Sequence, residues 1–194
     1  MATPTRGAAP APLRRPARPR PGATAVEGRA GPGCEAGESP LACEYRLLHP
    51  AFSLVMFGTN DAGFVAPDAF REANARIVDE SLARNVIPIL STIPPRLDDR
   101  SANRNVRRFN RLITDVARQN RLPLINFWRA TQGPRMVNQG MHDDGIHPNV
   151  FSSYECDPFC EPLNFSSEAL AYGYNQRNLA TVRTLDRIRR MVIE

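Results

Sequence analysis

Short apolar runs alternate with amphipathic helical patterns along the middle of this 194-residue chain. The runs, which are typical of buried strands, are 52–57, 86–93 and 124–127. The segments between them, which carry apolar side chains on one helical face, are 68–85 and 101–120. A β-α-β-α-β series of this kind folds into a parallel sheet with right-handed crossovers. We therefore predict an α/β domain.

The segments on either side of this series have weaker patterns. Residues 34–50 read as a loop that leads into the first strand, and the chain is expected to be irregular after Trp128. Ser166-Ser167-Glu168 is expected to open a last helix. Its predicted packing face consists of Leu179, Val182, Leu185, Ile188 and Val192. The arginines between these residues are interpreted as a solvated face.

The first 33 residues differ in composition from the rest of the chain. They hold six Arg against one Glu, a net charge of +5, which equals the net charge of the whole chain. Residues 34–194 are therefore neutral. A segment of Ala, Pro, Arg and Gly buries too little apolar surface to offset its ordering entropy, so we predict a disordered tail at 1–33 and a folded domain at 34–194.

The same composition excludes two classes of function. The positive charge lies on the predicted tail, which has no aromatic residue to stack on a base, so a nucleic-acid partner is not expected. No run of 18 or more apolar residues occurs, so no membrane span is expected. This sequence also has no apolar segment of the kind found in signal peptides.

Four cysteines form two close pairs, Cys34 with Cys43 and Cys156 with Cys160. Close spacing in loops favours two disulfides and an oxidising compartment, which is extracellular or periplasmic for the complete form of the protein. The alternatives are four free thiols or a zinc site. Zinc is disfavoured because the spacing is unfamiliar and no His lies beside either pair, so no metal is predicted.

The first chemical motif is Gly58-Thr59-Asn60-Asp61, directly after the first predicted strand. Ligands of open parallel sheets bind beyond the carboxyl ends of the strands. Gly58 lets the backbone turn sharply, and the Asn60 amide could donate a hydrogen bond to a developing oxyanion. The alternative is an ordinary strand-to-helix turn.

The second motif is Asp144-Gly145-Ile146-His147, followed by Pro148. An Asp three residues before a His can accept a hydrogen bond from Nδ1 and leave Nε2 free to act as a base. Pro148 restricts His147 to extended angles. A structural Asp-His pair is the alternative. His142 has no acid three residues earlier and is not assigned a role.

The two motifs, in this order and on this predicted fold, resemble the SGNH (GDSL) hydrolase family from about Leu41 to the C-terminus. The resemblance implies a five-stranded, flavodoxin-like sheet with helices on both faces, and hydrolysis of a small-molecule, carbohydrate or lipid ester without metal or cofactor. It assigns Asn60 to the oxyanion hole, with Gly58 supporting its turn. His147 becomes the general base, and Asp144 the acid that orients it.

The nucleophile of the family should lie in a Gly-Asp-Ser block after the first strand, and no such block is found. Gly37-Glu38-Ser39 is the nearest imitation, but Ser39 is only 14 residues before Ser53, in the next strand. One βαβ unit alone takes about 30 residues, so Ser39 is excluded. We identify no nucleophile and no second oxyanion glycine.

The missing block also affects the expected fold, because the first strand of the family lies beside 52–57. That strand would become an unpaired apolar edge. We therefore expect an N-terminally truncated domain that lacks its first strands and is inactive as an esterase. Two rival hypotheses are a catalytically dead remnant that acts as a binding module, and an interaction protein whose folded part is only a scaffold.

Overall fold

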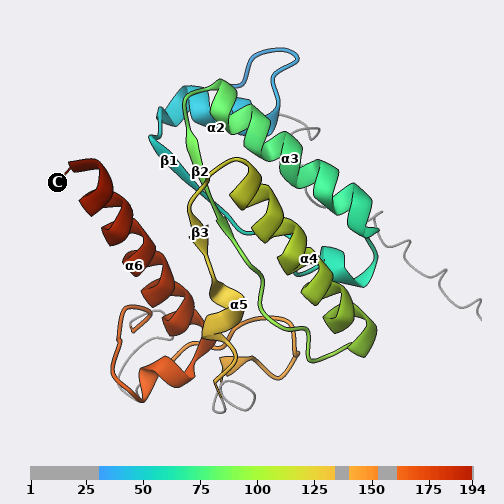
Figure 1. Ribbon diagram of the computed structural model, residues 1–194, viewed down its shortest axis with the longest axis vertical. Coiled ribbons are helices and arrows are strands. Elements are labelled where there is room, and N and C mark those ends of the chain that lie inside the picture. The colour runs from blue at the N-terminus through green and yellow to red at the C-terminus, as the bar shows by residue number, and fades with distance from the viewer. Residues whose placement is uncertain (1–30, 134–139, 153–160, 194) are drawn as a thin grey trace, which may run out of the picture.

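The computed structural model describes residues 31–133, 140–152 and 161–193. Three strands form a parallel sheet in the order β1-β2-β3, as Figure 1 shows. They are β1 (Phe52–Val55), β2 (Ile87–Ser91) and β3 (Leu124–Ile125). The sequence prediction of an α/β fold with a parallel sheet is confirmed.

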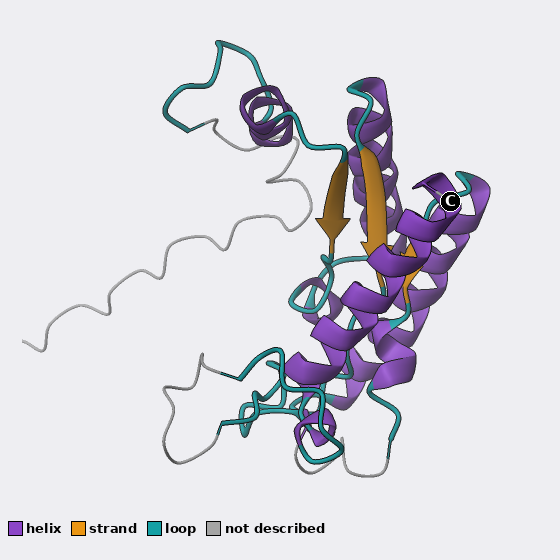
Figure 2. Cartoon of the chain, turned by 90° about the vertical axis from the view of Figure 1, so that its left-hand side faces the viewer, coloured by secondary structure: helices purple, strands orange, loops and turns teal. Residues whose placement is uncertain are grey.

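Helices cover both faces of this sheet (Figures 1 and 2). Helix α3 (Pro67–Ala83) joins β1 to β2, and helix α4 (Arg100–Gln119) joins β2 to β3. The chain moves across the sheet in one direction, so both right-handed crossovers lie on the same face. Helix α6 (Gly173–Ile193) lies on the opposite face and packs on β3. The short helices are η1 (Asp61–Gly63), α5 (Phe127–Ala130) and η3 (Ala169–Ala171).

Alternate side chains of the strands divide the core into two layers, because successive residues of a strand point to opposite faces. Leu90 of β2 belongs to the layer under α3 and α4, where the rings of Phe70 and Phe109 stack with centroids 3.9 Å apart. Its neighbour Ile89 points to the other face and packs with Ile125 and Phe127 near α6. The sheet is therefore buried on both sides at β2.

The predicted loop at 34–50 is wrong, because Pro40–Leu48 forms helix α2. Ser39 caps this helix: its Oγ accepts a hydrogen bond from Ala42 N at 3.0 Å, and Pro40 occupies the first turn, where a missing N–H costs nothing. The Tyr45 hydroxyl ties the helix to the sheet by donating to Ser53 Oγ at 2.7 Å.

The predicted packing face of the last helix is only partly correct. Ala180 and Ile188 pack against the core, but Val182, Leu185 and Val192 are 46%, 39% and 73% exposed. Helix α6 packs over β3. The apolar residues on its predicted packing face therefore outnumber those that the sheet beneath can bury.

The outer edge of β1 has no strand paired with it among residues 31–133, 140–152 and 161–193. Phe52 and Leu54 of β1 are 36% and 57% exposed, and the adjacent Ile87 of β2 is 41% exposed. Among the described residues, this arrangement agrees with the unpaired apolar edge that the sequence led us to expect. None of the described helices is long and apolar enough to cross a membrane.

Candidate active site

The turn after β1 depends on Gly58. Its φ of +121° lies in a region that L side chains rarely adopt. A Cβ at this position would also lie 2.8 Å from Cε2 of Phe70 and 3.3 Å from Cδ1 of Ile93. The backbone can therefore turn tightly over the core only where residue 58 has no side chain.

Asn60 follows in this turn and is exposed at the carboxyl end of β1. Its carbonyl accepts from Gly63 N at 3.2 Å, but its side chain does not cap the short helix η1. Within the described chain, the Asn60 amide has no hydrogen-bond partner. It is therefore free to donate to a ligand.

Asp61, the last residue of the first motif, is only 3% exposed. Burial raises the pKa of Asp61 to about 6, because the ionised carboxylate loses hydration. The sequence placed Asp61 in the motif but gave no sign of its burial, which depends on how η1 packs against α4.

Asp144 and His147 lie within hydrogen-bond distance, with Asp144 Oδ2 at 2.6 Å from His147 Nδ1. The other carboxylate oxygen accepts from the backbone N–H groups of Ile146 and His147 at 2.8 and 3.0 Å. The His147 side chain and these two N–H groups hold the pKa of Asp144 well below its usual range. The His147 side chain is 67% exposed, so its ring is open to a ligand.

These two residues belong to segment 140–152, a hairpin-like loop that lies beyond the carboxyl ends of the strands, in orange in Figure 1. An antiparallel bridge pairs Met141 with Pro148, and His142 N donates to His147 O at 2.8 Å. Gly145 has a φ of +68°, and a Cβ there would lie 2.6 Å from Asp98 N. The loop therefore contacts the segment that follows β2.

Arg96, in that segment, joins the two motifs. Its Nη1 donates to Thr59 O at 2.8 Å, and its Nε and Nη2 each lie 2.6 Å from the carboxylate of Asp98. Next to it, Leu97 N donates to Gly145 O at 2.8 Å. Arg96 is only 9% exposed, and its bidentate contact with Asp98 raises its pKa. Sequence reasoning missed this residue, whose one local signal is its position after Pro94-Pro95 at a strand end.

Ser39 lies far from this site. Helix α2, which Ser39 caps, precedes β1 and lies at the amino ends of the strands in Figure 1. The Ser39 hydroxyl donates to Glu80 near the end of α3, at 3.4 Å. Asn60 follows the carboxyl end of β1, so Ser39 and Asn60 lie at opposite ends of the strands. The position of Ser39 agrees with its exclusion on chain length.

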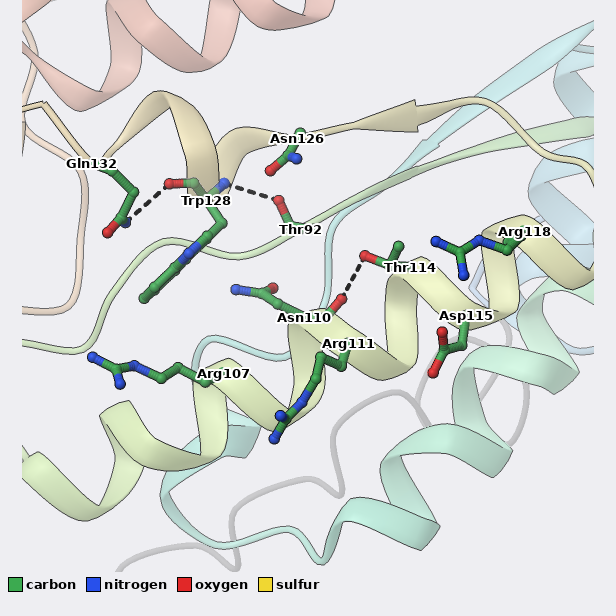
Figure 3. A pocket seen from close by; sticks show the side chains of 10 residues that line it. All are labelled: Thr92, Arg107, Asn110, Arg111, Thr114, Asp115, Arg118, Asn126, Trp128 and Gln132. Carbon is green, nitrogen blue, oxygen red and sulfur yellow. Dashed lines mark hydrogen bonds between the residues drawn. The ribbon is translucent and has the colours of Figure 1, made fainter.

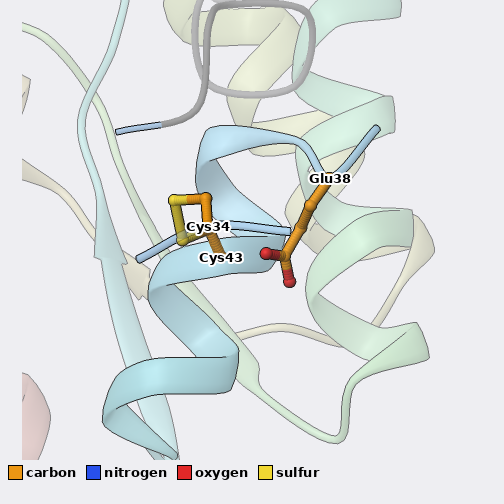
Figure 4. Close-up of side chains that lie close together, drawn as sticks. All are labelled: Cys34, Glu38 and Cys43. Carbon is orange, nitrogen blue, oxygen red and sulfur yellow. A yellow bond between two sulfur atoms is a disulfide. The ribbon is translucent and has the colours of Figure 1, made fainter. Parts of the chain in front are cut away.

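The predicted pairing of Cys34 with Cys43 is present as a disulfide, with the Cα atoms 5.3 Å apart (Figure 4). Cys156 and Cys160 lie outside the described residues. The Glu38 carboxylate lies beside the disulfide, and both of its oxygens accept from Arg46, at 3.0 and 2.9 Å. With both sulfur atoms in a disulfide, these three side chains do not offer the thiolates that a zinc site needs.

The sequence of this chain matches the model of a known protein family. The sequence profile of the GDSL-like lipase/acylhydrolase family matches residues 13–151, which include both motifs. The chain belongs to this family. The match begins at residue 13, whereas the structure describes the chain from residue 31 onward. No curated protein sequence matches it.

Solved structures share the fold of this GDSL-like chain. A lipase/acylhydrolase from Enterococcus faecalis is 22% identical, with a TM-score of 0.53 over 72% of this chain and 63% of the other. A GDSL-like lipase from Bacteroides thetaiotaomicron VPI-5482 is 18% identical, with a TM-score of 0.55 over 75% and 68%. The psychrotrophic esterase EstA from Pseudoalteromonas sp. is 17% identical, with a TM-score of 0.53 over 76% and 69%. The chain thus spans less than two thirds of the first of these proteins.

Proposed function

We propose that this chain carries the base side and one oxyanion donor of an SGNH-type serine ester hydrolase. The observation that carries the proposal is the 2.6 Å contact between Asp144 and His147 Nδ1 on a largely exposed ring. A carboxylate at this distance fixes the tautomer in which Nδ1 carries the proton. The unprotonated Nε2 then has the lone pair that a general base needs.

The reaction would run through an acyl-enzyme. His147 Nε2 takes the proton of a serine hydroxyl while the serine oxygen attacks the ester carbonyl, and the resulting imidazolium gives that proton to the departing alkoxide. Asp144 stabilises the imidazolium. Water then attacks the acyl-enzyme with His147 again as the base, and the imidazolium returns the proton to the serine oxygen as the carboxylic acid leaves. The Asn60 amide would donate to the oxyanion that forms in each half of the reaction.

The serine of this scheme is not identified in the chain. Ser39 is the candidate that follows a Gly-acid pair. It caps α2 near the amino ends of the strands, whereas Asn60 follows the carboxyl end of β1. We therefore propose that this chain alone does not hydrolyse esters. The Cys34–Cys43 disulfide supports export to an oxidising compartment as part of the same proposal.

A covalent serine probe tests the inactive state directly. The purified chain, incubated with a fluorophosphonate, is expected to gain no adduct by mass spectrometry and to hydrolyse p-nitrophenyl acetate no faster than the buffer does. The variant Ser39→Ala is the matched control, and it is expected to behave like the parent chain in both measurements. An adduct on any serine that disappears in His147→Ala would mean that the chain holds its own activated nucleophile.

Restoring the nucleophile tests the assigned roles. A family-type N-terminal segment with a Gly-Asp-Ser block, grafted before β1, is expected to create esterase activity. His147→Ala should then abolish most of the turnover, because the serine loses its base. The matched control is His142→Ala, since His142 Nδ1 lies 3.7 Å from the same Asp144 oxygen. Equal losses in the two His variants would contradict the assignment of His147.

Asn60→Ala in the same grafted protein tests the oxyanion role, because it removes the amide donor without adding a charge. We expect kcat to fall on the order of 10²-fold with KM little changed, since the donor acts on the transition state. A rise in KM alone would show that Asn60 only binds substrate.

A further inference from the structure

Positive charge is concentrated on helix α4. It holds six arginines and one acid, Asp115, a net charge of +5, although residues 34–194 as a whole are neutral. None of these six arginines makes an ion pair with another residue in the part of the chain that the structure describes. This helix therefore carries five uncompensated charges, which repel one another and attract anions.

Three of these arginines line a groove between α4 and the segments that follow β2 and β3. The groove has a volume of about 620 Å³, and its α4 side carries Arg107, Arg111 and Arg118 together with one acid, Asp115. The rise of an α-helix separates the first two by about 6 Å along the axis, and the second and third by about 10 Å. The groove thus has three arginines at positions spaced along the axis of α4.

The opposite wall of the groove is aromatic and uncharged. In Figure 3 the Trp128 ring projects from α5 toward α4, and the Arg107 side chain extends beneath it. Asn126 and Gln132 contribute exposed carboxamides on the same side. A ligand in this groove would meet one flat apolar ring, neutral hydrogen-bonding groups, three arginines and the single acid Asp115.

We propose that this groove binds an acidic oligosaccharide, a linear chain of sugar units with carboxylate or sulfate groups. Arginine pairs with such groups through two parallel N–H···O bonds, and the spaced arginines match charges repeated along a chain. The Trp128 ring stacks on the apolar face of one sugar, and the carboxamides bind hydroxyls. A single-stranded nucleic acid fits less well, because it uses several aromatic platforms and Trp128 is the one aromatic residue of the described groove.

Trp128 makes binding directly measurable, because it is the single tryptophan of the chain. We expect its fluorescence to change saturably when hexagalacturonate is added to the purified chain at low salt, and the affinity to fall as salt is raised. The neutral hexasaccharide maltohexaose is expected to bind at least tenfold more weakly. Calorimetry provides a second measurement of both affinities. No saturable signal in either method, or equal affinity for the neutral sugar, would overturn the proposal.

Matched variants separate the groove from the general charge of α4. Arg107→Gln/Arg111→Gln is expected to weaken hexagalacturonate binding at least about tenfold, because each removes a charged hydrogen-bonding group. Arg104→Gln/Arg108→Gln removes the same charge from exposed positions of the same helix outside the groove, and is expected to weaken binding less than about threefold. Thermal unfolding of both variants, compared with the parent, verifies that the fold is retained.

Two further outcomes would refute the proposal. Equal loss of affinity in the two double variants would mean that α4 attracts anions diffusely and that the groove has no role. Tighter binding of a dT12 oligonucleotide than of hexagalacturonate, also lost in Arg107→Gln/Arg111→Gln, would assign the groove to nucleic acid. These measurements use no ester substrate, so they are independent of the proposed hydrolase function.

Discussion

Replacing Asp61 by asparagine is expected to stabilise the fold at neutral pH. Asp61 is 3% exposed, and burial raises the pKa of its carboxyl group from an ordinary 3.8 to about 6. Each unit of pKa difference between the folded and unfolded states corresponds to about 1.4 kcal/mol. Ionised Asp61 therefore lowers the free energy of unfolding by about 3 kcal/mol at pH 7.5, and the uncharged amide of the variant removes this cost.

The sign of the pH dependence follows from proton binding. A carboxyl group with a raised folded pKa binds more protons in the folded than in the unfolded chain between about pH 4 and pH 6. Stability falls as pH rises through this window and is level above it. An asparagine side chain cannot ionise, so the advantage of Asp61→Asn is about 3 kcal/mol at pH 7.5 and about 1 kcal/mol at pH 4.5.

Urea denaturation followed by circular dichroism at the two pH values measures this difference, provided that unfolding is reversible. Asp143→Asn is the matched control, because Asp143 is exposed and a surface change of this kind alters stability by no more than about 0.5 kcal/mol. A stability difference for Asp61→Asn that is the same at both pH values, or a variant less stable than the parent at pH 7.5, would refute the reasoning.

Two further predictions concern backbone and covalent constraints. Gly58→Ala is expected to lower the free energy of unfolding by about 3 kcal/mol, because it combines a φ of +121° with a Cβ that collides with Phe70. Gly37→Ala, at a φ of +82° with open space, should cost only about 1 kcal/mol in the same urea titration, and equal losses would mean that the collision is relieved. Reduction of the Cys34–Cys43 disulfide should cost about 3 kcal/mol, and non-reducing peptide mapping that found these two thiols alkylatable would contradict the pairing.

The alternation of strands and helices could be predicted because its signals are local. Apolar runs with β-branched residues locate strands, and the helical period locates α3 and α4, whose observed ends lie within two residues of those expected. Helix α2 was missed although Ser39-Pro40 is a recognisable helix start, because the segment between two cysteines and a proline was read by its composition alone. The exposure of the α6 stripe depends on how much sheet lies beneath it, which no local pattern encodes.

The candidate site divides in the same way. Asp144 and His147 are three residues apart, so their contact could be expected from spacing and the intervening glycine. Arg96 contacts a carbonyl 37 residues earlier in the chain, and its role became visible only when the sheet brought these segments together. The burial of Asp61 is a tertiary effect of the same kind. Sequence therefore predicted the parts of the site and not what holds them together.

The three residues from Arg96 to Asp98 have a consequence for how the site can evolve. Arg96 holds the turn before Asn60, and Leu97 and Asp98 contact the loop that carries His147, although 87 residues separate Asn60 from His147. Both motifs are therefore held against the same short peptide at the strand end. In the ester hydrolase proposed above, substitutions in that peptide would change the gap between Asn60 and His147, and hence the size of ester that fits, while both side chains stay unchanged.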